Sequence, residues 1–202
     1  MTATLLLVLI VGLRGFGEGC GATLQLREGI VPDVAAVAKQ ARDQGDPLRF
    51  LLLVSEAAKA QALAGHRSLT VPLSVARMLL GGLLFVAGAR AMNGRRGSRG
   101  LLLQALFAGA AFAGLEYALT SGVRGAWIDM LVRACAMLPE DLPDRQSWTD
   151  PALWWMAERV RLVAFDVGLL AVAALALTRR RATAYFRAAA AAAEDEEETG
   201  GP

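Results

Sequence analysis

The chain has 202 residues, 55% of them hydrophobic, and a mean hydropathy of +0.41. It is too apolar for an ordinary soluble domain, because its apolar residues gather into long blocks. The formal net charge of +2 gives no basic footprint for nucleic acid, and two cysteines with one histidine are too few for a Cys/His metal site. We therefore expect no nucleic-acid partner, no metal and no other cofactor.

Residues 1–25 are predicted to form the first membrane span, although charges and glycines interrupt the block. The clean apolar run, Ala3–Leu13, is shorter than the roughly 20 residues that a span needs. A cleaved signal peptide is an alternative, but it needs a basic N-terminal region and a small-residue cleavage site. Gly19-Cys20 suggests a lipoprotein signal, but Gly17 and Glu18 stand where such signals carry small or aliphatic residues. We favour a retained helix.

Glycines at alternate positions of this span predict close packing against another helix. Gly15/Gly19 and Gly17/Gly21 each form a G-x-x-x-G pair, a spacing that lets a second backbone approach. We expect the helix to form in lipid despite its glycines. Leaving backbone groups without hydrogen bonds in lipid costs more free energy than placing glycine in a helix. Further helix-packing faces are predicted at Gly81/Gly82, Ala105/Gly109 and Ala110/Gly114.

Residues 26–70 are predicted to form a helical segment outside the membrane. The stretch "PDVAAVAKQARDQG" aligns Val34, Val37, Ala38 and Ala41 on one helix face and ends at Gly45. Asp46-Pro47 then reads as an N-cap and a first-turn proline of a second helix. That helix is not counted as a span, because it carries Arg49, Glu56 and Lys59. His66, just beyond it, is expected to be an interfacial polar residue.

Three further apolar blocks, 71–92, 101–121 and 159–178, are long enough to cross a bilayer. The turn 93–100 and the start of the tail 179–202 are basic and hold no acid. Because basic residues beside span ends stay inside, we expect both of these segments and both termini to be cytoplasmic. The expected location is the cell membrane, as a multi-pass protein of the inner membrane if the host is a bacterium with two membranes.

Residues 122–158 are predicted to form an outer amphipathic segment. Trp127, Met130, Leu131, Ala134 and Leu138 share one face, which indicates a helix lying on the membrane or on the other outer segment. Four tryptophans in or beside this segment fit an interfacial aromatic belt: Trp127, Trp148, Trp154 and Trp155. Asp150-Pro151 opens the last helix. The alanine-rich tail continues a helix, and its acidic end, "EDEEETGGP", is expected to be disordered.

Five ionisable residues fall inside the predicted spans: Arg14, Glu18, Arg77, Glu116 and Asp166. At a rise of about 1.5 Å per residue, antiparallel helices bring them to a similar depth in the outer half of the membrane. Charges at such depth are costly and are candidates for function. Three interpretations stay open: a structural ion-pair network, snorkelling to the interface, and a proton or ion relay or polar ligand pocket.

The two cysteines are both expected at the outer side, where oxidation can occur. A disulfide between Cys20 and Cys135 is one interpretation, and two small buried thiols is the one we favour. A mobility shift on a non-reducing gel distinguishes the two.

The fold class expected is all-α, a polytopic membrane protein with four transmembrane helices in a bundle and a small helical extracytoplasmic cap. Enzyme motifs are absent, including the P-loop, G-x-S-x-G, H-E-x-x-H and C-x-x-C. We expect a non-enzymatic scaffold or accessory subunit of a membrane assembly. Its partners would be the lipid bilayer and either further copies of the chain or another membrane protein. The alternative is a small transporter or channel component that uses the charge cluster.

Overall fold

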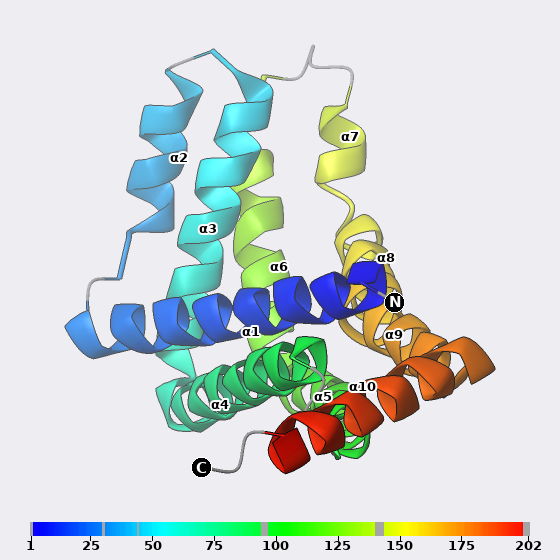
Figure 1. Ribbon diagram of the computed structural model, residues 1–202. Helices are drawn as coiled ribbons and strands as arrows, with labels where there is room; N and C mark the ends of the chain where they lie inside the picture. Colours follow the sequence, from blue (N-terminus) through cyan, green and yellow to red (C-terminus); the bar gives the residue numbers. More distant parts are fainter. Residues whose placement is uncertain (1, 30, 44, 94–96, 140–143, 200–202) are drawn as a thin grey trace. The chain divides into compact units, whose positions relative to one another are not determined.

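The computed structural model describes residues 2–29, 31–43, 45–93, 97–139 and 144–199 (Figure 1). Its regular structure is helical, with no strand among these residues, which confirms the all-α prediction. The helices are α1 (Thr2–Glu28), α2 (Val34–Arg42), α3 (Pro47–Gly65), α4 (Arg67–Met92), α5 (Ser98–Leu119), α6 (Ser121–Cys135), α7 (Arg145–Trp148), α8 (Pro151–Arg161), α9 (Gly168–Thr178) and α10 (Arg180–Thr199). A π-helical segment, η1 (Leu162–Val167), joins α8 to α9.

Four helices are long and apolar enough to cross a membrane: Thr2–Glu28, Arg67–Met92, Ser98–Leu119 and the continuous stretch Pro151–Thr178. These correspond to the four predicted spans. The first of them, α1, runs without a break through the arginine, the glutamate and the glycines that interrupt its apolar run. The last begins eight residues earlier than the predicted 159, because Asp150 caps it: the Ala152 amide donates to the Asp150 carboxylate (2.9 Å).

The chain forms two compact units, which we describe separately. The first unit contains residues 1–20, 74–115 and 162–202, and the second contains residues 21–73 and 116–161. α1, α4 and α5 therefore each contribute to both units.

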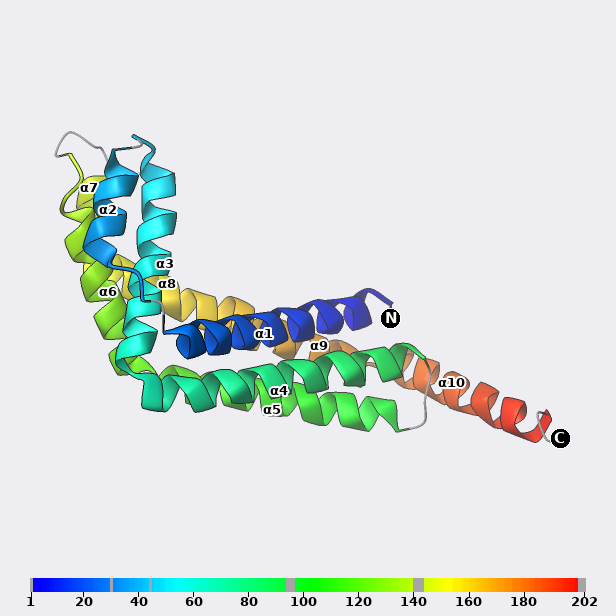
Figure 2. The same cartoon turned by 90° about the vertical axis from the view of Figure 1, so that its left-hand side faces the viewer.

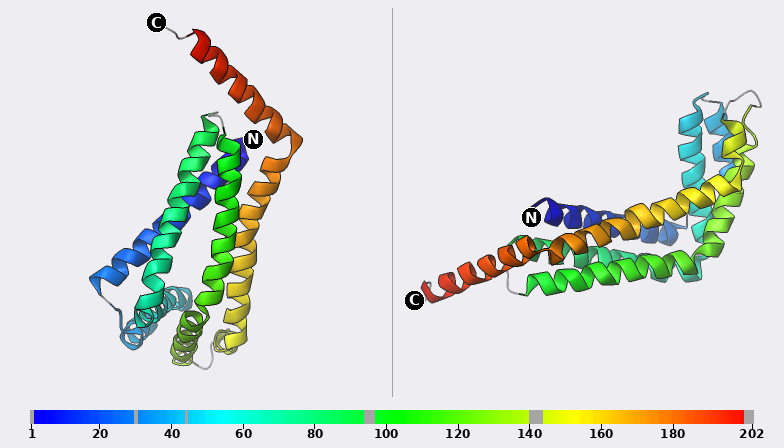
Figure 3. Two further views of the ribbon diagram at one scale, coloured as in Figure 1. Left: turned by 90° about the horizontal axis from the view of Figure 1, so that it is seen from below. Right: turned by 90° about the vertical axis from the view of Figure 1, so that its right-hand side faces the viewer.

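The core of the first unit is aliphatic and draws on all four long helices. α4, α5 and α9 run side by side, and α1 crosses α4 (Figures 2 and 3). The core is made by Leu5, Val8, Leu84, Ala87, Ala91, Leu102, Ala105, Leu106, Leu170, Ala173 and Leu177. The start of α1, the end of α4, the start of α5 and the end of α9 lie at the same end of this unit (Figure 2). Consecutive long helices thus alternate in direction within this unit.

The second unit is built on α2, α3 and α6, which stand side by side (Figure 1). As predicted, Val34, Ala38 and Ala41 are buried on one face of α2, and Val37 is partly buried. The predicted face of α6 packs on the same core, so this helix lies on the other outer segment. Three tryptophans also pack against this core: Trp127, Trp148 and Trp154. The Trp127 indole donates to the Ser55 carbonyl (3.2 Å) and so links α6 to α3.

Short-range signals in the sequence set the ends of α2 and α3. Gly45 follows α2 with φ +71°, and its amide donates to the Arg42 carbonyl. The Asp46 carboxylate accepts from the amides of Leu48 and Arg49, and Pro47 occupies the first turn of α3. Both features confirm the predicted boundary.

The tail is more regular than predicted. α10 continues to Thr199, so helix includes most of the acidic stretch that the sequence indicates to be disordered; its last three residues lie outside the described residues. Alanine and glutamate both favour helix, which accounts for this extension.

Candidate functional site

The closest approach of two helices in the first unit is lined by glycine. Gly12, Gly15 and Gly19 lie on one face of α1 and meet α4 around Gly81. A Cβ added at Gly19 would lie 2.6 Å from the Met78 nitrogen, and one at Gly12 would lie 2.7 Å from the Phe85 nitrogen. Because these are backbone atoms, they cannot move aside cheaply, and the contact requires glycine.

Only part of the predicted glycine pattern takes part in this contact. Gly15 and Gly19 belong to it, whereas a Cβ at Gly17 or Gly21 would meet nothing within 4 Å. Gly109 packs against side chains of Leu84 and Leu170, and a Cβ at Gly114 would also meet nothing within 4 Å. Sequence reasoning missed Gly12, although its spacing of three and seven from Gly15 and Gly19 places it on the same helix face.

An ion-pair chain borders the glycine contact. The Glu18 carboxylate accepts from Arg14 of its own helix (2.8 Å) and from Arg77 of α4 (2.6 Å). Glu18 precedes Gly19, and Arg77 precedes Met78, so the charges and the backbone contact occupy the same level of the two helices. This arrangement ties α1 to α4 at one register.

The other two predicted charges have different surroundings. Glu116 belongs to the second unit, in the last turn of α5. Asp166 belongs to the first unit and lies half-buried in η1, inside the fourth long helix. The π-helical geometry places the Val163 carbonyl 2.5 Å from where a Cβ of Gly168 would be. Single π-helical turns often occur at functional sites.

The second unit holds a buried arginine that the sequence analysis did not single out. Arg124 of α6 is 8% exposed. Its guanidinium lies 3.6 Å from the centroid of the Tyr117 ring, and the Trp155 ring is 6.0 Å away. The guanidinium donates to the Thr120 hydroxyl (2.7 Å) and to the Tyr117 carbonyl, and Thr120 in turn donates to the Glu116 carbonyl. Arg124 therefore caps the C-terminal end of α5.

Burial lowers the pKa of Arg124 from its ordinary value, since the charged form loses solvation. Tyr117, Glu158 and Glu116 act in the opposite direction and favour the charged form. Glu158 also pairs with Arg161 at 3.0 Å. These contacts connect the end of α5, the start of α6 and α8 within the second unit.

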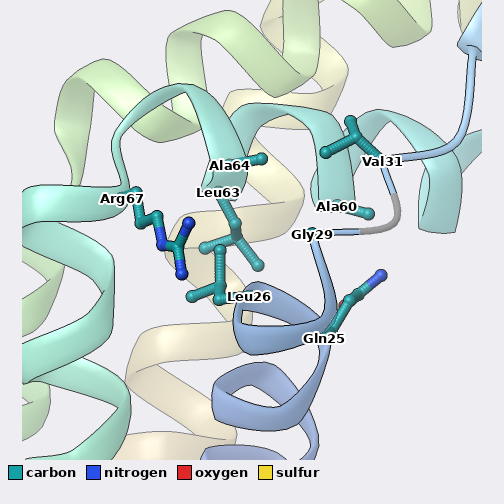
Figure 4. Close-up of a pocket in the computed structure, with 8 residues that line it drawn as sticks. All are labelled: Gln25, Leu26, Gly29, Val31, Ala60, Leu63, Ala64 and Arg67. Atoms are coloured by element: carbon teal, nitrogen blue, oxygen red, sulfur yellow. The ribbon is translucent and has the colours of Figure 1, made fainter.

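A pocket of about 180 Å³ lies where α1 ends and α4 begins (Figure 4). It is lined by Gln25, Leu26, Gly29, Val31, Ala60, Leu63, Ala64 and Arg67. All of these residues belong to the second unit. Its walls are mainly apolar, with one guanidinium and one amide.

Both cysteines are thiols in the structure, Cys20 half-buried and Cys135 buried. A disulfide between them stays the alternative to the pair of thiols that we favour. Burial raises the pKa of the Cys135 thiol to about 11, which makes it unreactive. The His66 ring donates from Nδ1 to the Ala62 carbonyl (3.1 Å), where it ends α3.

No group of three or more His, Cys, Asp or Glu suited to a metal ion occurs among the described residues. Comparison of the chain with protein-family models, with curated proteins and with solved structures finds no match.

Proposed function

We propose that the protein is a multi-pass membrane scaffold or accessory subunit without enzymatic activity, located in a bacterial inner membrane with both termini in the cytoplasm. The observation that carries this proposal is the apolar surface of the four long helices. In their most apolar windows only 17–22% of residues are buried. Large side chains along them are exposed, including Ile10, Leu79, Phe107 and Leu175. Such a surface needs lipid or partner helices to cover it.

The charged residues of the first unit support a structural rather than a transporting role. Arg14 and Arg77 both pair with Glu18 beside a backbone contact that only glycine permits. Charges held in this way fix the register of α1 on α4. The second unit has a core of its own and offers a further surface for recognition of a partner.

The test is extraction of the natively expressed protein in a gentle detergent, followed by affinity purification and native mass measurement. A membrane-protein partner at fixed stoichiometry, or a defined homo-oligomer, is the expected result. A monomer with no co-purifying protein would contradict the scaffold role.

The alternative is a small transporter or channel component, and one observation favours it. Asp166 lies in the π-helical segment of a spanning-length helix, where an ionisable group is expensive. Reconstitution in proteoliposomes tests this function. A transport role predicts a proton or ion flux that Asp166→Asn or Glu116→Gln abolishes while assembly stays intact; a scaffold role predicts no flux.

A further inference from the structure

We propose that the pocket in Figure 4 binds the headgroup phosphate of an anionic phospholipid, recognised by Arg67. The inference rests on the proposed membrane insertion of α1 and α4. It adds a defined lipid site to a surface that otherwise contacts lipid without selectivity.

The charge in the pocket indicates an anion. Arg67 is the charged residue among those that line it, and its side chain is exposed. Among the described residues, no hydrogen bond or ion pair occupies its guanidinium. A guanidinium presents a planar fork of donors that matches two phosphate oxygens, which makes arginine the preferred residue for this group. The neutral Gln25 amide lines the same pocket and adds donors without opposing charge.

The walls of the pocket indicate that the anion carries an apolar part. In Figure 4 the Leu26 and Leu63 side chains point toward each other beside the Arg67 guanidinium. Val31, Ala60 and Ala64 complete an apolar lining. A free phosphate would gain nothing from these walls, whereas the glycerol and first acyl carbons of a phospholipid would bury apolar surface there.

The position of the pocket along the helices fits a headgroup. Leu26 is in the last turn of α1, and Arg67 is the first residue of α4. Both helices are candidate spans. Ends of spans lie at the level of the lipid phosphates, where arginine and anionic headgroups attract each other.

The experiment uses the full chain in an uncharged detergent and follows thermal unfolding by tryptophan emission. All four tryptophans belong to the second unit, so the signal reports on the unit that contains the pocket. Short-chain phosphatidylglycerol should raise the melting temperature in a saturable way, since it binds the folded state. Phosphatidylcholine at equal concentration should give a smaller rise, and inorganic phosphate should give none.

Two variants locate the effect. Arg67→Gln should weaken the apparent affinity for phosphatidylglycerol by about tenfold or more, because a charge-assisted fork is lost. Ala64→Phe keeps the charge but fills the pocket, and it should abolish the rise. Arg49→Gln is the control, because Arg49 is exposed on α3 and does not line the pocket; it should respond as the unmodified chain does.

Three results would overturn the inference: no rise with phosphatidylglycerol, an equal rise with inorganic phosphate or phosphatidylcholine, or an undiminished rise in Arg67→Gln. Each of these leaves the proposed function intact, because partner capture and membrane topology are measured separately. If the protein were instead found in the soluble fraction without detergent, that result would contradict the proposed function.

Discussion

At Gly19 the absence of one carbon decides whether two helices can meet. Met78 and Ser74 of α4 present backbone atoms where a Cβ would be, 2.6 Å away in both cases. Gly17, two residues earlier on the same helix, faces open space. The two positions are chemically identical in the sequence and differ only in what lies opposite.

Gly19→Ala should therefore lower the free energy of unfolding by about 1–3 kcal/mol, the range of other overpacked sites. Gly17→Ala is the matched control and should be neutral or stabilising, since alanine favours helix by up to about 1 kcal/mol over glycine. Thermal unfolding of both variants in detergent measures the difference. Equal melting temperatures would contradict the close contact of α1 with α4.

Arg124 shows a second residue whose role depends on its surroundings. Its hydrogen bonds to Thr120 and Tyr117 and its stacking on the Tyr117 ring use the shape of the guanidinium as well as its charge. Arg124→Met should lose about 1.5–3 kcal/mol, the range for hydrogen bonds of charged groups. Arg124→Lys should not restore this, because lysine has no planar fork. Arg133→Met, at an exposed position of the same helix, is the control in unfolding experiments; an equal loss there would contradict the capping role.

The buried thiol of Cys135 makes a prediction with a defined pH range. Its pKa is raised to about 11 from an ordinary value of 9.0, so the folded state holds the proton more tightly. The stabilising contribution is complete below about pH 9 and is lost as the pH rises through about 11. Stability should fall over that range, and less so in Cys135→Ala. In the native protein at neutral pH a maleimide should label Cys135 only after unfolding; rapid labelling would contradict its burial.

At the scale of elements, the ion-pair chain and the glycine contact act together on α1 and α4. Glu18 forms ion pairs with both Arg14 and Arg77, so its removal leaves two cations without their shared anion. Glu18→Gln and Arg77→Gln should each lower detergent stability. A double-mutant cycle should show a coupling of about 0.5–3 kcal/mol between them. Purely additive losses would indicate that the charges act independently, contrary to the structure.

Arg77→Ala and Glu116→Ala are also expected to lower the level of protein in the membrane.

The ends and faces of the helices follow from signals a few residues apart, and the sequence predicts them well. Asp46, Pro47 and Gly45 bound α3 and α2 through their own backbone geometry. Partners distant in the chain are different. Gly12 and Gly81 are separated by 69 positions, and only the crossing of α1 and α4 makes them neighbours. Arg124 likewise acquires its role from the turn at Thr120, and no periodicity in the sequence marks that turn.

The tryptophans show that composition alone does not distinguish a core position from an interfacial one. A cluster near predicted span ends indicates an interfacial belt. In the structure Trp127 and Trp154 form an edge-to-face pair, 6.4 Å between ring centroids, and both pack against the core of the second unit. An aromatic residue serves a core and an interface equally well, and the sequence does not distinguish the two.

At the scale of the whole molecule, the proposed topology requires four crossings with both termini on one side. The first unit is consistent with it, since the start of α1 and the end of α9 lie at the same end of this unit (Figure 2). The basic residues of 93–100 and of the tail predict that this side is the cytoplasm.

The most direct measurement is labelling of single cysteines with a membrane-impermeant maleimide in spheroplasts, in a chain whose Cys20 and Cys135 are replaced by alanine. Ala36→Cys, exposed on α2, should label in intact spheroplasts. Ala184→Cys, exposed on α10, should label only after the membrane is opened. Labelling of both positions in intact spheroplasts would contradict four crossings, and labelling of Ala184→Cys alone would contradict the proposed orientation.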